Sequence, residues 1–250
     1  MTKATYPSLA GRSVLVTGGA SGIGEAIVRG FARNGASVAL LDVDVEAGES
    51  LAAELGATTQ FLACDLTDVA ALRDAVREAE SRLGPIRALV NNAANDQRFP
   101  LEEITPEQWD ASQAVNLRHQ FFVTQAALPG MKGAGGGTVV NLSSIAWHVG
   151  IAELVPYAAA KAAVWGLTKT LGGALGKDGI RVNAVAPGAV MTPRQLRLWH
   201  NPESAARAIA AQSLHDSILE DDVADAVLFL SADDSRMITK QCLTVDGGAL

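Results

Sequence analysis

Tyr157 and Lys161 lie four residues apart in the stretch Tyr157-Ala-Ala-Ala-Lys161, a spacing that places both side chains on one face of a helix. A free phenol has a pKa near 10, so a tyrosine by itself is a poor base at neutral pH. An ammonium group close by favours the phenolate and lowers that pKa. The pair therefore indicates proton exchange with an alcohol or a carbonyl oxygen. Because the same spacing is common on helix surfaces, its meaning depends on the rest of the chain.

Composition excludes several classes of function for this chain of 250 residues. The net charge is −7 and no Lys/Arg run occurs, which argues against a nucleic-acid partner. Cys64 and Cys242 form neither a metal-ligand spacing nor a disulfide framework, so we expect no metal site and a reducing compartment. Residues 1–12 contain no apolar run, and no stretch has the length of a membrane span. We expect a soluble, cytoplasmic protein that binds no membrane.

A glycine-rich loop follows the first apolar stretch of the chain. Residues 13–17 have the β-branched character of a buried strand, Gly18-Gly-Ala-Ser-Gly-Ile-Gly24 follows at once, and residues 25–34 have a helical pattern. Missing side chains let the backbone approach a pyrophosphate, and the free N–H groups of the helix meet its negative charge. The spacing is Gly-x-x-x-Gly-x-Gly, not the commoner Gly-x-Gly-x-x-Gly. The strand, loop and helix together predict a dinucleotide site.

Asp42 stands at the end of the next apolar stretch, residues 37–41. This places a carboxylate where the adenosine ribose of a dinucleotide should lie. A carboxylate accepts hydrogen bonds from ribose hydroxyls and repels a 2′-phosphate. No Arg or Lys occupies positions 20, 21 or 43, where it could receive that phosphate. The cofactor predicted is therefore NAD and not NADP.

Strand and helix patterns alternate along the whole chain. Further strands are predicted over 59–63, 86–90, 138–142, 180–185 and 241–245, and helices over 45–55, 67–83, 106–131, 157–176 and 221–231. This alternation predicts an α/β fold, a single Rossmann-type doubly wound parallel sheet of about seven strands flanked by helices. We expect one domain over residues 1–250, with a dinucleotide-binding part at about 12–142 and a catalytic and substrate-binding part at about 143–250. Asp65, at the end of the third strand, can face the adenine or cap the helix that follows it.

These motifs together resemble the short-chain dehydrogenase/reductase family over nearly the whole chain. The matching residues are Thr17-Gly-Gly-Ala-Ser-Gly-Ile-Gly24, Asp65, Asn91-Asn-Ala93, Asn116, Ser144, Tyr157, Lys161, Pro187-Gly188 and Thr192. One departure is Ala94, where the family usually has glycine; a methyl group there can crowd the cofactor. The resemblance implies an oxidoreductase acting on CH–OH groups.

The resemblance also implies a role for each catalytic residue. Tyr157 is the general acid/base, and Ser144 hydrogen-bonds the reacting oxygen, with Ser143 as the competing serine. Lys161 holds the nicotinamide ribose and lowers the tyrosine pKa, while Asn116 positions a water that relays protons from Lys161. The NAD-binding set implied is Gly18, Ser21, Gly22, Ile23, Gly24, Asp42, Asp65, Leu66, Asn92, Tyr157, Lys161, Pro187, Gly188, Val190 and Thr192.

Three segments should form the substrate pocket: residues 95–98, 145–148 and 192–200. They are polar and contain two tryptophans, which suits a polyhydroxylated ligand better than a steroid or a long acyl chain. The candidate substrate contacts are Asn95, Trp147, His148, Gln195 and Trp199. Each tryptophan can equally be packed in the core, and His148 can be a surface residue.

A finer resemblance concerns the substrate. Residues 6–9, 115–120, 147–148, 192–195 and 210–212 are similar to bacterial NAD-dependent aldose 1-dehydrogenases of the D-xylose type. That similarity implies oxidation of an aldose at C1 to its lactone, with L-arabinose and L-fucose as other possible substrates; the C-terminal residues 242–250 are those of the wider family. Alternatives are a dehydrogenase of a 2-keto-3-deoxy sugar acid, a 3-oxoacyl carrier-protein reductase, and a non-catalytic NAD-sensing regulator. Alanine-rich helices and the family habit imply a homotetramer, or else a dimer.

Overall fold

The protein is built around one parallel sheet, which the computed structural model describes together with the rest of residues 3–199 and 201–250. The described residues form seven strands in the order β3-β2-β1-β4-β5-β6-β7. Their bounds are β1 Ser13–Thr17, β2 Ser37–Asp42, β3 Thr59–Ala63, β4 Ala88–Asn91, β5 Gly137–Leu142, β6 Ile180–Pro187 and β7 Cys242–Val245. The prediction of a doubly wound parallel sheet is confirmed.

The strand register aligns the polar strand ends at one edge of the sheet. Thr17 pairs with Leu41 on one side and with Asn91 on the other, and Asn91 in turn pairs with Asn141. The first strand is buried along its whole length, as expected for an apolar strand covered on both faces. Chain segments that leave the sheet at this edge therefore start side by side.

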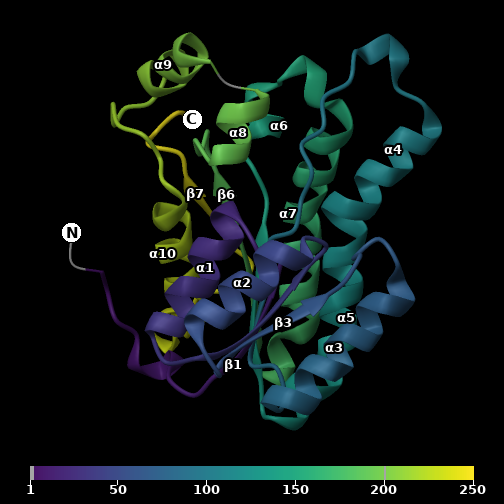
Figure 1. Cartoon of the computed structure of the whole chain (residues 1–250), viewed down its shortest axis with the longest axis vertical. Helices are drawn as coiled ribbons and strands as arrows, with labels where there is room; N and C mark the ends of the chain where they lie inside the picture. The colour runs from purple at the N-terminus through teal and green to yellow at the C-terminus, as the bar shows by residue number, and fades with distance from the viewer. Residues whose placement is uncertain (1–2, 200) are drawn as a thin grey trace.

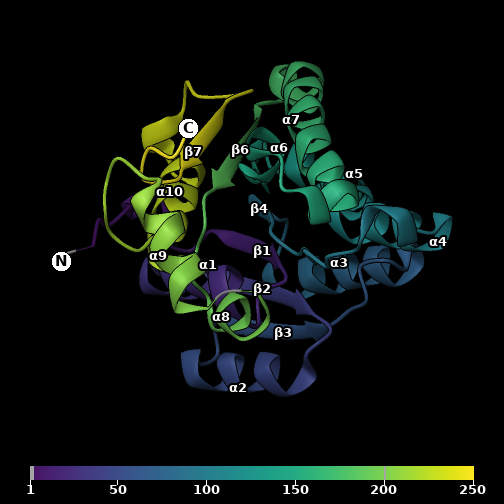
Figure 2. The same cartoon turned by 90° about the horizontal axis from the view of Figure 1, so that it is seen from above.

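Helices cover both faces of the sheet (Figures 1 and 2). Their bounds are α1 Gly22–Arg33, α2 Val45–Leu55, α3 Val69–Leu83, α4 Pro106–Gln113, α5 His119–Gly133, α6 Ala146–Val149, α7 Val155–Leu175, α8 Pro193–Leu198, α9 Pro202–Ala210 and α10 Glu220–Ser231. One buried cluster joins α1, α2 and α10 to the sheet, and a second joins α3, α5 and α7 to the opposite face. The two clusters make a three-layer structure that holds the strand ends in place.

The helix predicted over 106–131 is interrupted in the structure. It consists of α4, a π-helical turn at Ala114–Arg118, and α5. Three short helices, α6, α8 and α9, were not predicted. Helices α8 and α9 cap the carboxyl edge of the sheet at the top of Figure 1.

Two features are absent from the part of the chain that the structure describes. None of the helices there is long and apolar enough to cross a membrane. No group of three or more His, Cys, Asp or Glu side chains in residues 3–199 and 201–250 is arranged to hold a metal ion.

Candidate active site

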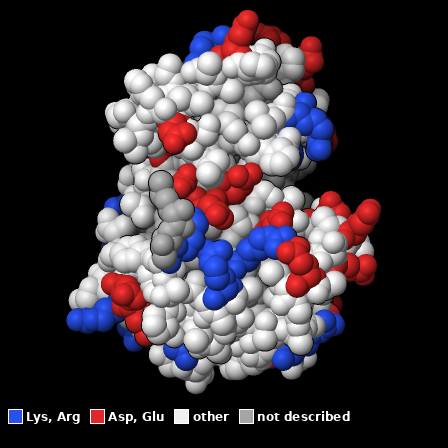
Figure 3. Space-filling model, turned by 60° about the vertical axis from the view of Figure 1, so that its left-hand side comes forward, with Lys and Arg blue, Asp and Glu red and all other residues white. Residues whose placement is uncertain are grey.

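A cavity of about 950 Å³ opens at the carboxyl edge of the sheet. Its walls are the glycine loop, the segments that follow β2 to β6, the start of α7, helix α8 and the region after α9. Charged groups of both signs line it, among them Asp42, Asp96, Lys161 and Arg194. Figure 3 shows acidic and basic side chains side by side in a hollow across the middle of one face.

The glycine loop lies so close to its neighbours that side chains do not fit at two positions. A Cβ on Gly24 would lie 1.8 Å from the carbonyl oxygen of Gly18, and a Cβ on Gly18 would lie 2.7 Å from the Cα of Ala93. Gly18 also has a φ of +64°, a left-handed conformation that favours glycine. Asn92 donates its side-chain amide to the carbonyl oxygen of Gly18 at 2.8 Å and so fixes the loop.

The first turn of α1 is open for a phosphate. Ser21 is the N-cap residue of this helix, and its side chain makes no capping hydrogen bond. The backbone N–H groups of the first turn are then available to an anion. The bare backbone and the open helix end fit a dinucleotide pyrophosphate, as predicted.

Asp42 and Asp65 lie at the far end of the cavity from α7, each beside a strand end. Asp42 accepts hydrogen bonds from the backbone N–H of Ala20 at 3.0 Å and of Val43 at 2.8 Å, which joins the glycine loop to β2. Asp65 accepts from the backbone N–H and the hydroxyl of Thr67. The N-cap of α3 is Asp68, so Asp65 begins a turn and does not cap that helix.

The structure brings the predicted cofactor residues together. The lining of the cavity includes Gly18, Ser21, Gly22, Ile23, Gly24, Asp42, Asp65, Leu66, Asn92, Tyr157, Lys161, Pro187, Gly188, Val190 and Thr192. Ala94, the departure from the family pattern, lines the same cavity and is exposed. Its methyl group therefore has room within the segment that follows β4.

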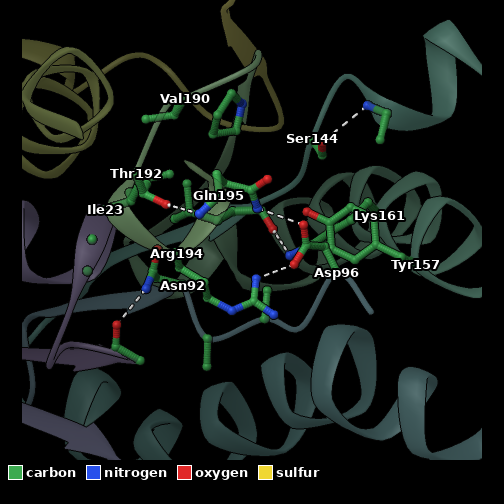
Figure 4. Close-up of a pocket in the computed structure, with 18 of the residues that line it drawn as sticks. Ile23, Asn92, Asp96, Ser144, Tyr157, Lys161, Val190, Thr192, Arg194 and Gln195 are labelled. Atoms are coloured by element: carbon green, nitrogen blue, oxygen red, sulfur yellow. Dashed lines mark hydrogen bonds and ion pairs between the residues drawn. The ribbon is translucent and has the colours of Figure 1, made fainter. Parts of the chain in front are cut away.

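Ser144, Tyr157 and Lys161 meet at one end of this cavity (Figure 4). The Lys161 Nζ lies 5.6 Å from the centre of the Tyr157 ring. Ser143 donates its hydroxyl to the carbonyl oxygen of Lys161 at 2.7 Å, whereas the Ser144 hydroxyl accepts a hydrogen bond from Ala146 at 3.1 Å. Ser143 therefore anchors α7, and Ser144 is the serine that is free to donate its hydroxyl proton to a substrate.

The pKa of Tyr157 is raised in this structure, whereas the sequence led us to expect a lowered one. Burial, and then the carboxylate of Asp96, raise the pKa of Tyr157 to about 12, although the Ser144 hydroxyl favours the phenolate. The buried Lys161 Nζ donates to the carbonyl oxygen of Leu142 at 2.8 Å, and burial lowers its own pKa to about 7. Lys161 thus supports the backbone at the end of β5, and its effect on the pKa of Tyr157 stays a prediction.

Asn116 is fully buried in the π-helical turn, and protein groups satisfy its side chain. Its amide oxygen accepts from the backbone N–H of Asn95 at 2.9 Å, and its amide nitrogen donates to the carbonyl oxygen of Asn95 at 2.9 Å. A further bond joins it to the hydroxyl of Ser112. The side chain therefore holds the loop after β4, and the role of Asn116 in positioning a water stays a prediction.

Asp96 is a charged cavity residue that the sequence did not single out. Its carboxylate accepts hydrogen bonds from Arg194 and, at 2.6 Å, from Gln195, both of which lie on α8. Figure 4 shows the carboxylate between these side chains and Tyr157. The sequence predicted that residues 95–98 form a pocket wall but favoured Asn95, because a loop has no periodicity to show which side chain points inward.

Four of the five predicted substrate contacts lie outside the cavity lining that the described residues form; only Gln195 belongs to it. His148 is exposed, and the Trp147 ring packs against His148 and edge-on against Trp165 of α7. Asn95 is exposed and accepts from Arg194 at 3.1 Å.

The remaining predicted contact, Trp199, lies under the guanidinium group of Arg98, 4.8 Å from the ring centre. Trp199 follows α8, and its ring contacts Arg98, which lines the cavity. His200, the last residue of the predicted pocket segments, lies outside the described residues.

Comparisons with known proteins agree with this geometry. A family model described as enoyl-(acyl carrier protein) reductase matches residues 18–249. The "Probable galactose dehydrogenase GalD" of Rhizobium meliloti (strain 1021) is 49% identical, with 97% of this chain and 96% of that protein covered. The D-xylose 1-dehydrogenase of Caulobacter vibrioides (strain NA1000 / CB15N) is 45% identical, with 99% of each covered.

A solved structure shows the same fold. The crystal structure of a "putative short-chain alcohol dehydrogenase" from Sinorhizobium meliloti 1021 superposes with a TM-score of 0.92 at 34% identity, with 98% of each chain covered.

Proposed function

Because the chain belongs to the short-chain dehydrogenase/reductase family, we propose that it oxidises an aldose at its anomeric carbon to the lactone, with NAD as the cofactor. The observation that carries this proposal is one continuous cavity, in which the glycine loop and Asp42 lie at one end and Ser144, Tyr157 and Lys161 at the other. Relatives named for galactose and D-xylose oxidation, 49% and 45% identical, supply the substrate class.

Three side chains, Ser144, Tyr157 and Lys161, carry out the proton transfer in the proposed reaction. A bound nicotinamide supplies the hydride acceptor, which is chemistry that protein side chains lack. The Tyr157 phenolate accepts the proton of the sugar hydroxyl, and the Ser144 hydroxyl donates a hydrogen bond to the same oxygen. Lys161, one helical turn from Tyr157, supplies a positive charge when it is protonated, and its pKa of about 7 allows it to exchange protons at neutral pH.

NAD is proposed over NADP on the position of one carboxylate. Asp42 lines the cavity at the end of β2, and each of its oxygens already accepts from a backbone N–H. An ionised carboxylate has further lone pairs, which can accept from ribose hydroxyls. The same negative charge at this position would repel a 2′-phosphate.

The proposed substrate is polyhydroxylated because the inner cavity contains fixed polar groups. Asp96, Arg194 and Gln195 present a carboxylate, a guanidinium group and an amide near Tyr157. Such groups pair with hydroxyls, whereas a long acyl chain would leave them without partners. This favours an aldose over the acyl thioester of a 3-oxoacyl carrier-protein reductase.

One assay tests the function. The purified chain is incubated with NAD or NADP and a panel of aldoses, sugar acids and acyl thioester mimics, and the reduced cofactor is followed by absorbance. We expect turnover with NAD and an aldose, at least tenfold less with NADP, and loss of nearly all turnover in Tyr157→Phe with NAD binding retained. Near-normal activity of Tyr157→Phe would refute the assignment, and tight NAD binding without turnover on any substrate would favour a sensor.

The proposal extends to organisation and assembly. Residues at about 12–142 would bind the dinucleotide, and those at about 143–250 would supply catalysis and the substrate pocket.

A homotetramer is proposed because small residues of α7, such as the exposed Ala159 and Ala163, permit close helix packing, and Phe121 on α5 is 38% exposed. Light scattering of the purified chain would measure the mass directly.

A further inference from the structure

The Asp96 carboxylate lies in the cavity that holds the reacting groups. It belongs to the loop after β4, and Asn116 fixes this loop through the backbone of Asn95. Its charge reaches the reacting groups, since it raises the pKa of both Tyr157 and Lys161. A substrate bound against Tyr157 is therefore close to this carboxylate.

The carboxylate is ionised and is not suited to take the reaction's proton. Burial acts to raise its pKa, but the hydrogen bonds from Arg194 and Gln195, together with the charge of Arg194, outweigh burial and lower the pKa. A carboxylate with a lowered pKa is a weak base. Its use in the cavity must then be as a hydrogen-bond acceptor.

Asp96 retains capacity to accept more hydrogen bonds. Arg194 donates to one oxygen and Gln195 to the other, whereas a carboxylate offers about four lone-pair sites. Only 12% of the side chain is exposed, so bulk water has limited access to the remaining sites. The hydroxyls of a sugar are donors of the right kind for them.

We propose that Asp96 binds a sugar hydroxyl other than the one that is oxidised, and so selects polyhydroxylated substrates. The inference rests on the proposed function, which counts Asp96 among the polar groups near Tyr157 but does not say which sugar hydroxyl it binds. Because Arg194 and Gln195 hold the same carboxylate from α8, the hydroxyl would be bound where the loop after β4 meets that helix.

The test compares Asp96→Asn with the wild-type chain on one aldose and its monodeoxy derivatives. The aldose is the one that the wild-type chain oxidises fastest with NAD, and kcat and KM are measured separately. For one derivative, we expect the wild-type chain to lose at least tenfold in kcat/KM relative to the parent sugar. Asp96→Asn should lose a similar factor on the parent sugar, mainly through KM, and should discriminate between the two sugars by less than threefold.

A matched control separates recognition from loop anchoring. Glu153→Gln is also a carboxylate-to-amide change, and it weakens the ion pair of Glu153 with Arg98 on the same loop, whereas Glu153 itself is not part of the cavity lining. It should keep the wild-type ratio between the parent sugar and each derivative within twofold. If Asp96→Asn fails to fold, Asp96→Glu retains the charge and should show an intermediate ratio.

Two failures are distinguishable. If the wild-type chain oxidises no aldose, both the proposed function and this inference are refuted. If the wild-type chain oxidises an aldose but Asp96→Asn, or Asp96→Glu in its place, lowers kcat/KM by the same factor on every derivative, Asp96 only anchors the loop and this inference alone is overturned.

Discussion

Asn116 makes two reciprocal hydrogen bonds with the backbone of Asn95, accepting from its N–H and donating to its carbonyl oxygen, both at 2.9 Å. The pair joins a π-helical turn to the loop after β4, two segments twenty-one residues apart in the chain. Since Asp96 is the next residue along that loop, the direction of its carboxylate depends on a buried amide in a different element. Asn116 is thus a positioning residue for the cavity wall.

Asn116→Ala should therefore impair both stability and turnover. Its removal leaves the N–H and the carbonyl oxygen of Asn95 without their side-chain partner, which costs about 1–3 kcal/mol. Urea unfolding measures that loss, and we expect KM for the sugar to rise because Asp96 is no longer held. Ser112→Ala removes only the third bond of the amide and should cost about 1 kcal/mol or less, with KM unchanged. Equal effects of the two variants would contradict this role.

The titration of Tyr157 can be observed directly because the chain contains two tyrosines. Tyr6→Phe leaves Tyr157 as the single phenol, and its ionisation can be followed by ultraviolet absorbance. With a pKa of about 12, set by burial and by the Asp96 charge, ionisation should begin only above pH 10 in the absence of cofactor. A midpoint below pH 9 would show that Lys161 already lowers the pKa in the free protein.

The variant Asp96→Asn tests, in the same ultraviolet titration, whether the Asp96 charge raises the pKa of Tyr157. Removing a negative charge stabilises the phenolate, so the pKa of Tyr157 should fall. Adding NAD, whose nicotinamide ring is cationic, should shift the pKa in the same direction. The activity measured as kcat/KM should rise with pH while the phenolate forms, and in Asp96→Asn this rise should occur at lower pH.

Apolar patterning predicted the sheet and its ligand edge because both depend on buried strands. The runs that end at Thr17, Leu41 and Asn91 are largely apolar, and each is followed by a segment that carries a predicted cofactor residue. Glycine spacing and the Tyr157–Lys161 interval are local patterns, so they too were visible in the sequence. These features account for the prediction of a dinucleotide site beside a proton-transferring pair.

Other features depend on contacts that no local pattern records. The π-helical turn inserts a residue into an otherwise continuous helical pattern, so residues 106–131 resembled one helix. The position of Trp147 was set by Trp165 in another helix, and the environment of Lys161 by the carbonyl oxygen of Leu142. Asp96 and Asn95 are neighbours in a loop, where only the fixed backbone shows which side chain faces the cavity.

Gly24→Ala should disrupt the dinucleotide site. The added Cβ would lie 1.8 Å from the backbone oxygen of Gly18, a fixed group, so the loop must move. We expect the dissociation constant of NADH, measured by fluorescence titration, to rise at least tenfold, with a loss of stability. Gly133→Ala is the control, since nothing lies within 4 Å of its added Cβ; alanine in a helix should stabilise the chain by up to about 1 kcal/mol. Unchanged NADH affinity in Gly24→Ala would contradict the proposed pyrophosphate site at the glycine loop.

His119 gives the protein a pH-dependent stability that is separate from catalysis. It is the first residue of α5, and it is fully buried. Burial, followed by the charge of Lys161, lowers its pKa to about 3, although backbone hydrogen bonds with Val115 and Ala114 act in the opposite direction. The unfolded chain has an ordinary histidine pKa of about 6.5, so between pH 6.5 and 3 the unfolded state binds a proton that the folded state does not.

The free energy of unfolding should therefore decrease as the pH falls below 6.5, because protonation of His119 favours the unfolded chain. The loss is on the order of 1–2 kcal/mol between pH 6.5 and 5, since each unit of pH is worth about 1.4 kcal/mol once the unfolded histidine is protonated. Urea unfolding at both pH values measures it in the wild-type chain and in His119→Asn, which does not titrate. The variant should lose less stability than the wild type over this interval by that amount. Equal losses in the two chains would mean that His119 is protonated in the folded protein, and that its burial beside Lys161 does not keep it neutral.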